Sequence, residues 1–257
     1  MSVKGSEKGR KAGEEATSPR KAKKRRLQPF HNIRAHVNPL SDLSFDERPT
    51  KPDEFDWSTH YPSLKKGSDA VSVLDIGCGY GGLTVALSKA LPESFILGME
   101  IRPKVVEFVE QTITKLREEN PGEYNNISVL RSNAMKFLPN FFKKGQISTM
   151  FFLFPDPQFK SKTHKRRIIS TPLLADYAYV LREGGCLYTV TDVLDLHVWM
   201  VDHLTRFPLF ERISDAELEG DPLVPLVMSS THEARKVEKV QGSKHLAVFR
   251  RRADPAA

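Results

Sequence analysis

A single acid stands between two prolines in the stretch "MFFLFPDPQFKSKTHKRR", residues 150–167. Five apolar residues precede Pro155, and such a short run is typical of a buried strand. Asp156 is therefore expected just beyond the end of a strand. A carboxylate held there can accept hydrogen bonds from a ligand or stabilise a developing positive charge. Asp and Pro also favour plain turns, but the position favours an active-site acid.

A strongly basic segment follows this acid. Its members, with one histidine among them, are Lys160, Lys162, His164, Lys165, Arg166 and Arg167. Positive charge just past a strand end suits nucleic-acid phosphates, although the segment could also be a solvated face. The histidine could stack on a base or simply belong to the loop. A carboxylate that recognises a nucleobase, beside cations that bind the nucleic-acid backbone, would explain why opposite charges lie next to each other in this stretch.

A glycine-rich loop, "LDIGCGYGG" at residues 74–82, is the second chemical signal. Its glycines permit a tight turn and close approach of the backbone to a ligand. Gly77, Gly79 and Gly82 also satisfy the dinucleotide pattern G-x-G-x-x-G, so the glycines alone do not distinguish NAD from another nucleoside cofactor. A dehydrogenase is thus an alternative at this point.

Three polar residues near the ends of successive predicted strands favour S-adenosylmethionine over NAD. The carboxylate of Asp75 would repel the negative charges of a pyrophosphate, but it suits a cationic amino group. Glu100 stands where an acid binds ribose hydroxyls, and Asn133 offers an amide to an adenine edge. S-adenosylmethionine carries an amine, a ribose and an adenine, but no phosphate.

Alternating strands and helices must position these residues. Short apolar runs predict strands at 71–76, 94–100, 127–132, 147–154 and 186–191, with two more within 208–213 and 245–252. Helical patterns fall at 82–91, 102–119, 134–142, 171–182 and 194–206. This order predicts an α/β fold, a mostly parallel, Rossmann-like sheet with helices on both faces. Ligands in such sheets sit beyond the carboxyl ends of the strands.

Composition limits the class of protein. The chain has 257 residues and 39% hydrophobic content, enough for one large domain. It has no apolar run of the ~20 residues that a membrane span needs, and no secretory signal is expected. Two cysteines predict a reduced, intracellular protein, and the His and Cys spacings make a metal site unlikely.

The net charge of +7 lies in the N-terminal segment. Residues 1–26 hold ten Lys/Arg against three Asp/Glu, which leaves the remainder neutral. We predict a disordered basic tail over 1–28 and one domain over 29–257. The motif "RKAKKRR" could be a nuclear localisation signal, an RNA-binding arm or a solubilising tail. Residues 27–70 read as an extended, aromatic-rich lead-in across the core.

Six segments together resemble one enzyme family. They are "DIGCGYGG", "GMEIRPKV", "LRSNAMKFLPNFF", "FFLFPDPQFKSKTHKRRI", "LREGGCLYTVTD" and "STHEARKV". They are similar to the eukaryotic branch of the tRNA guanine-N7 methyltransferases, over residues 30–252. The resemblance implies a class I methyltransferase fold with a seven-stranded sheet, and methyl transfer from S-adenosylmethionine to N7 of guanine 46 in the variable loop of tRNA. It also implies a WD-repeat propeller as the non-catalytic partner in a heterodimer, and a nuclear location.

The resemblance also assigns residues. It places the cofactor contacts on Gly77, Glu100, Ile101, Arg102, Asn133, Ala134, Leu153, Thr231 and Glu233, and the active-site acid on Asp156. Ser230 and Glu233 also have capping-box spacing for a following helix. Two alternatives stay open: a non-catalytic RNA-binding subunit with this fold, and methylation of another RNA nucleobase.

Because N7 of guanine carries a free lone pair, its methylation needs alignment and charge stabilisation but no strong base. We therefore expect Asp156 to accept hydrogen bonds from the N1–H and the N2 amino group of guanine, and so to present N7 to the methyl group.

Overall fold

The computed structural model describes residues 37–41, 48–68 and 71–255, together with Met1. Apart from Met1, the basic tail 1–28 with its "RKAKKRR" motif lies outside the described residues, as do the first residues of the predicted domain. For these segments the sequence-based expectations stay predictions.

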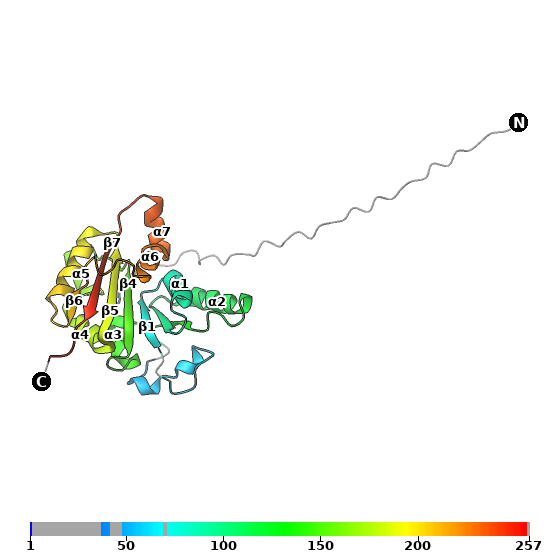
Figure 1. The fold of residues 1–257 in the computed structure, drawn as a ribbon, viewed down its shortest axis with the longest axis horizontal. Helices are drawn as coiled ribbons and strands as arrows, with labels where there is room; N and C mark the ends of the chain where they lie inside the picture. The colour runs from blue at the N-terminus through cyan, green and yellow to red at the C-terminus, as the bar shows by residue number, and fades with distance from the viewer. Residues whose placement is uncertain (2–36, 42–47, 69–70, 256–257) are drawn as a thin grey trace.

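One sheet organises the chain (Figure 1). Its strands are β1 (Val71–Ile76), β2 (Phe95–Glu100), β3 (Ile127–Arg131), β4 (Ile147–Leu153), β5 (Leu181–Thr191), β6 (Phe210–Arg212) and β7 (His245–Arg251). The strand order is β3-β2-β1-β4-β5-β7-β6, and only the pairs made by β7 are antiparallel. The predicted seven-stranded, mostly parallel sheet is confirmed.

Helices cover both faces of the sheet. They are α1 (Gly82–Ala90), α2 (Pro103–Glu119), α3 (Ala134–Phe141), α4 (Thr171–Val180), α5 (Leu194–Arg206), α6 (Leu223–Ser229) and α7 (His232–Lys239). Side chains of α1, α2 and α6 share one apolar cluster, whereas those of α3, α4 and α5 share the other. The strands between them are buried almost throughout, as expected for a sheet covered on both sides.

The described part of the lead-in packs against the second cluster. Two short 3₁₀ helices, Pro52–Glu54 and Trp57–Thr59, carry it past α3. The Trp57 ring stacks on Phe142 at 5.5 Å, and the Tyr61 hydroxyl donates to the carbonyl of Ile96. The lead-in is thus part of the core at these residues.

One predicted boundary was wrong. The helix expected over 171–182 ends at Val180, and the strand expected from 186 already begins at Leu181. Leu181 pairs with Ile147 before the register shifts, and Gly184 adopts a φ of 75° in the exposed irregularity that follows. A break of this kind interrupts the apolar pattern by which strands are recognised.

Candidate active site

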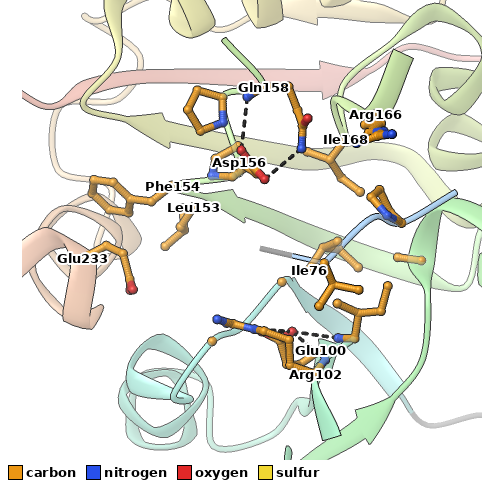
Figure 2. Close-up of a pocket in the computed structure, with 18 of the residues that line it drawn as sticks. Ile76, Glu100, Arg102, Leu153, Phe154, Asp156, Gln158, Arg166, Ile168 and Glu233 are labelled. Carbon is orange, nitrogen blue, oxygen red and sulfur yellow. Dashed lines mark hydrogen bonds and ion pairs between the residues drawn. The ribbon is translucent and has the colours of Figure 1, made fainter. Parts of the chain in front are cut away.

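A cavity of about 660 Å³ opens beyond the carboxyl ends of the central strands (Figure 2). The strand order reverses between β1 and β4, and loops after both strands line the cavity. This is where open α/β sheets bind ligands. Loops after β2, β3 and β5, the helix α7, and Val37 and Pro39 of the lead-in also line it.

The glycine loop after β1 is held tightly in place. Gly77 has a φ of 73°, and its N–H donates to the carbonyl of Met99 at 2.8 Å. Gly81 has a φ of 74°, and a Cβ there would lie 2.8 Å from Cγ1 of Val109 in α2. Left-handed backbone and close packing therefore both require glycine at position 81, and Gly77 lines the cavity as predicted.

Asp75 lies just before the glycine loop, as the sequence placed it, but its side chain is buried away from the cavity. Its side chain is 2% exposed, does not line the cavity and accepts a 2.7 Å hydrogen bond from the Thr84 hydroxyl. Burial raises the pKa of Asp75 to about 7, although the bond from Thr84 opposes this shift. In this structure the carboxyl group ties β1 to α1 through Thr84, and its contact with a cofactor amine stays a prediction.

Glu100 ends β2 as a buried acid on the cavity wall. One of its oxygens accepts from the backbone N–H of Ile101 at 2.8 Å and of Arg102 at 3.0 Å. The other oxygen accepts from Nη2 of Arg102 at 2.8 Å, and Figure 2 shows this ion pair below the cavity. All three residues line the cavity, so the predicted cofactor cluster is brought together here.

The loop after β3 contains the predicted Asn133 and Ala134, but the Asn133 amide is already engaged. Its oxygen accepts from the N–H of Met135 and caps α3, while its nitrogen donates to the carbonyl of Pro39. The neighbouring Ser132 is buried and lines the cavity, and its hydroxyl has no hydrogen-bond partner within the described chain. Buried hydroxyls are seldom unpaired, so Ser132 is a better candidate than the Asn133 amide for binding a ligand.

Asp156 lies beyond β4, as the sequence predicted. Leu153 ends the strand at the cavity wall, and Phe154 turns the chain with a φ of 50°. The Asp156 carboxylate accepts from the backbone N–H of Gln158 at 3.1 Å and from the amide of the same residue at 2.8 Å (Figure 2). These bonds fix the direction of the acid at the cavity.

The basic segment forms a short 3₁₀ helix, Ser161–Arg166, at the edge of the cavity. Its lysines at 160, 162 and 165 are exposed, which their predicted RNA contacts require. Arg166 lines the cavity. The half-buried His164 ring lies 5.2 Å from the ring of Trp199 in an edge-on contact, and its contact with RNA stays a prediction.

Arg167 requires a correction. Its side chain is only 5% exposed, and its guanidinium lies 4.6 Å from the ring of Trp199. Its Nε donates to the carbonyl of Pro157 at 2.9 Å. A buried guanidinium cannot meet an RNA phosphate, so we replace the predicted RNA contact of Arg167 with a structural role.

Helix α7 closes one side of the cavity. Glu233, Lys236 and Val237 line it. Thr231 does not, because its hydroxyl caps the helix by accepting from the N–H of Ala234 at 2.9 Å. The capping box expected at Ser230 was therefore wrong by one residue, and the cofactor contact of Thr231 stays a prediction.

Sequence reasoning missed many residues of the cavity wall, among them Ser132, Phe159 and Lys236. Ser132 immediately precedes a residue that was chosen, and Lys236 lies one helical turn after Glu233. Phe159 is an apolar residue that stands directly before the basic segment. These positions are visible in the sequence, but only the cavity shows that they belong to the site.

The described residues contain neither a cluster of metal ligands nor a membrane-spanning helix. No group of three or more His, Cys, Asp or Glu side chains within them could hold a metal ion. Among the same residues, no helix has the length and apolar character needed to cross a membrane.

Comparison with known proteins defines the class. The family described as "Putative methyltransferase" matches residues 69–247, which contain the glycine loop and Asp156. Among solved structures, the 16S rRNA methyltransferase KamB matches with a TM-score of 0.48 and 15% identity, over 72% of this chain and 88% of that chain. The chain is a class I methyltransferase by its sheet and by this family.

The names of curated relatives specify a reaction and a substrate. A tRNA (guanine-N(7)-)-methyltransferase of Dictyostelium discoideum is 50% identical over 91% of this chain and 84% of its own. One of Caenorhabditis elegans, with the same name, is 53% identical over 87% of each chain. The chain belongs to the tRNA (guanine-N7-)-methyltransferase family, as its motifs predicted.

Proposed function

We propose that this chain is the catalytic subunit that methylates N7 of guanine 46 in the variable loop of tRNA. The observation that carries the proposal is the position of Asp156. The acid lies at the switch point of the sheet, in the wall of a cavity large enough for a nucleoside cofactor and a base, with exposed lysines on the adjoining 3₁₀ helix. The names of the close relatives support the same reaction.

S-adenosylmethionine is the methyl donor in this class, and the residues of the cavity fit it. Ser132 contributes a buried hydroxyl with no partner among the described residues, and Glu100 contributes a buried carboxylate. Gly77 brings the backbone of the loop after β1 to the cavity wall with no side chain of its own. These residues would hold the cofactor, which supplies an electrophilic methyl group when bound.

Asp156 would bind the base. Guanine presents two donors, N1–H and the N2 amino group, along one edge, and a carboxylate can accept from both. The nucleophilic N7 lies elsewhere on the ring and needs no proton removed. Positive charge develops on the ring as the methyl arrives, so a fixed carboxylate beside it stabilises the transition state more than the ground state.

The proposal includes a partner and a location. A neutral domain of this size has limited area for a folded tRNA, which supports a WD-repeat propeller as the second subunit of a heterodimer. The basic N-terminal tail supports a nuclear location. Live imaging of the full chain and of a chain lacking residues 1–26, each fused to a fluorescent protein, tests the location. An unchanged distribution after the deletion contradicts the proposed signal.

The reaction is tested by incubating the full chain with tRNA and S-adenosylmethionine, with and without the propeller subunit. Nucleoside mass spectrometry then identifies the product, and mapping of the cleaved RNA locates it. We expect 7-methylguanosine in the variable loop, formed faster with the propeller. A different methylated nucleoside contradicts the proposed base, and equal rates contradict the dependence on the partner.

A further inference from the structure

Phe159 is an unusual residue for a cavity wall. Its side chain is 76% exposed, the highest exposure of any large apolar side chain in the described chain apart from Val240 and the terminal Met1. Yet it lines the same cavity as Asp156, three residues earlier. An exposed aromatic ring beside a catalytic acid offers a flat apolar face that no other part of the described chain covers.

The loop that presents this ring is held at several points. The N–H of Phe154 donates to the carbonyl of Val190 at 2.7 Å, and Arg167 bonds the carbonyl of Pro157. Gln158 adopts a φ of 49° while both its backbone and its side chain bond Asp156. The ring is therefore exposed on a fixed loop, and a ligand that stacks on it meets a preorganised surface.

Charge around the ring indicates the kind of ligand. Arg166 and Lys236 line the same cavity from two different elements, and Lys160 is exposed next to Phe159 in the sequence. An aromatic face with cations around it is the arrangement that binds an unstacked nucleobase and its phosphates. A peptide or a lipid would not explain why the acid adjoins the ring.

We propose that Phe159 stacks on the face of the target guanine while Asp156 binds its edge. The proposal deepens the function above and rests on tRNA guanine as the substrate. Two contacts from one loop, one to the edge and one to the face, fix the plane of the base. An aromatic face also attracts the positive charge that develops on the ring during methylation, so Phe159 positions the substrate and favours the transition state.

Three substitutions separate stacking from simple apolar packing. Phe159→Ala removes the ring, Phe159→Leu keeps apolar bulk without a π face, and Phe159→Trp enlarges the π face. Tyr179→Ala is the matched control, because Tyr179 is also an exposed aromatic residue but lies on α4 and does not line the cavity. The full chain is used, together with the propeller where activity requires it.

Single-turnover methylation at saturating tRNA is measured first. We expect Ala and Leu to lower the rate by about 10- to 100-fold, in line with the loss of one stacked base, and Trp to retain activity within about threefold. Tyr179→Ala should match wild type. S-adenosylmethionine affinity, measured by calorimetry, should be unchanged in all four variants.

A fluorescent base gives an independent signal. tRNA with thienoguanosine, a fluorescent guanine analogue that keeps the N1–H and N2 amino donors, at the methylated position should be quenched on binding to wild type and to Phe159→Trp, but brighter with Leu. Leu behaving as wild type in both measurements overturns the proposal. So does a Phe159→Ala variant that loses only its affinity for the propeller, since the ring would then contact protein. A wild type that makes no 7-methylguanosine would instead refute the proposed function.

Discussion

Arg167 holds the backbone of the loop after β4: its Nε donates a 2.9 Å hydrogen bond to the carbonyl of Pro157, the residue after Asp156. The guanidinium lies 4.6 Å from the ring of Trp199, whose own Nε1 donates to the carbonyl of Ile169 at 2.8 Å. Helix α5 is thereby connected to the active-site acid through one buried side chain. The last residue of the basic segment thus holds the loop that carries the Asp156 carboxylate.

Arg167→Lys should be nearly as damaging as Arg167→Ala. Lysine keeps the charge but lacks the planar guanidinium that bonds the carbonyl and packs on the indole. We expect both variants to lower kcat by about 10-fold or more, because a displaced loop misaligns the acid. S-adenosylmethionine affinity should change little. Steady-state kinetics, with calorimetry for the cofactor, gives the comparison.

Lys162→Ala is the control for phosphate binding, since its side chain is exposed on the same segment. It should leave kcat unchanged and reduce the log–log salt slope of tRNA affinity by about 0.7–0.9. Arg167→Ala should leave that slope unchanged. A lower slope for Arg167→Ala, with full activity in Arg167→Lys, would restore the RNA contact.

Asp156→Ala should lower kcat/KM for tRNA by roughly 100-fold, or about 2.7 kcal/mol, the usual loss for one preorganised electrostatic group. Asp156→Asn should recover little of this, because it directs an N–H₂ donor at the donors of guanine and carries no charge. Gln158→Leu removes one hydrogen bond to the Asp156 carboxylate. It should lower kcat/KM less than Asp156→Ala or Asp156→Asn does. Single-turnover rates test this order, and a near wild-type rate for Ala would remove Asp156 from the mechanism.

The sequence predicted the framework of this site better than the use of each side chain. Glycines, buried strands and an acid after β4 follow from short-range patterns, so the strand ends that carry Glu100 and Asp156 were placed correctly. Side-chain partners depend on segments distant in the chain. Asn133 bonds Pro39 and Arg167 packs on Trp199, and neither contact has a local signal.

A one-residue error also had a local cause. Ser230 and Thr231 are both good capping residues, and spacing alone favoured the serine. A Cβ on Gly82 would lie 2.4 Å from the carbonyl oxygen of Ser230, so this turn packs closely on the start of α1. Tertiary packing of this kind fixes where α7 begins. The apolar pattern of the sequence contains no information about such packing.

Glu100→Gln should weaken S-adenosylmethionine binding by about 10- to 100-fold. The amide still accepts with one oxygen, but its NH₂ group faces the Arg102 guanidinium that now donates to Glu100. An unpaired donor on the cavity wall and the loss of a charged acceptor both oppose binding. Calorimetry measures this loss.

Glu93→Gln is a suitable control for that measurement, because Glu93 is an exposed acid outside the cavity wall. It should bind the cofactor as wild type does. Equal affinities for Glu100→Gln and wild type would show that the cofactor does not use this carboxylate.

Asp75 should make the folded state less stable as pH rises. Burial raises its pKa from 3.8 to about 7, so below pH 4 both folded and unfolded chains hold the proton. Between pH 4 and 7 the unfolded chain releases it and the folded chain does not. The free energy of unfolding therefore falls by up to about 1.4 kcal/mol per pH unit from this group, and levels off above pH 7.

Two variants isolate this effect from other titrating groups. Asp75→Asn has no proton to lose, so its stability relative to wild type should increase from pH 5 to pH 7. Thr84→Val removes the donor that stabilises the carboxylate, which should raise the pKa of Asp75 further and extend the fall in stability above pH 7. Urea unfolding of the full chain at several pH values measures both trends. A constant difference between Asp75→Asn and wild type across this range would show that Asp75 is already ionised in the folded protein.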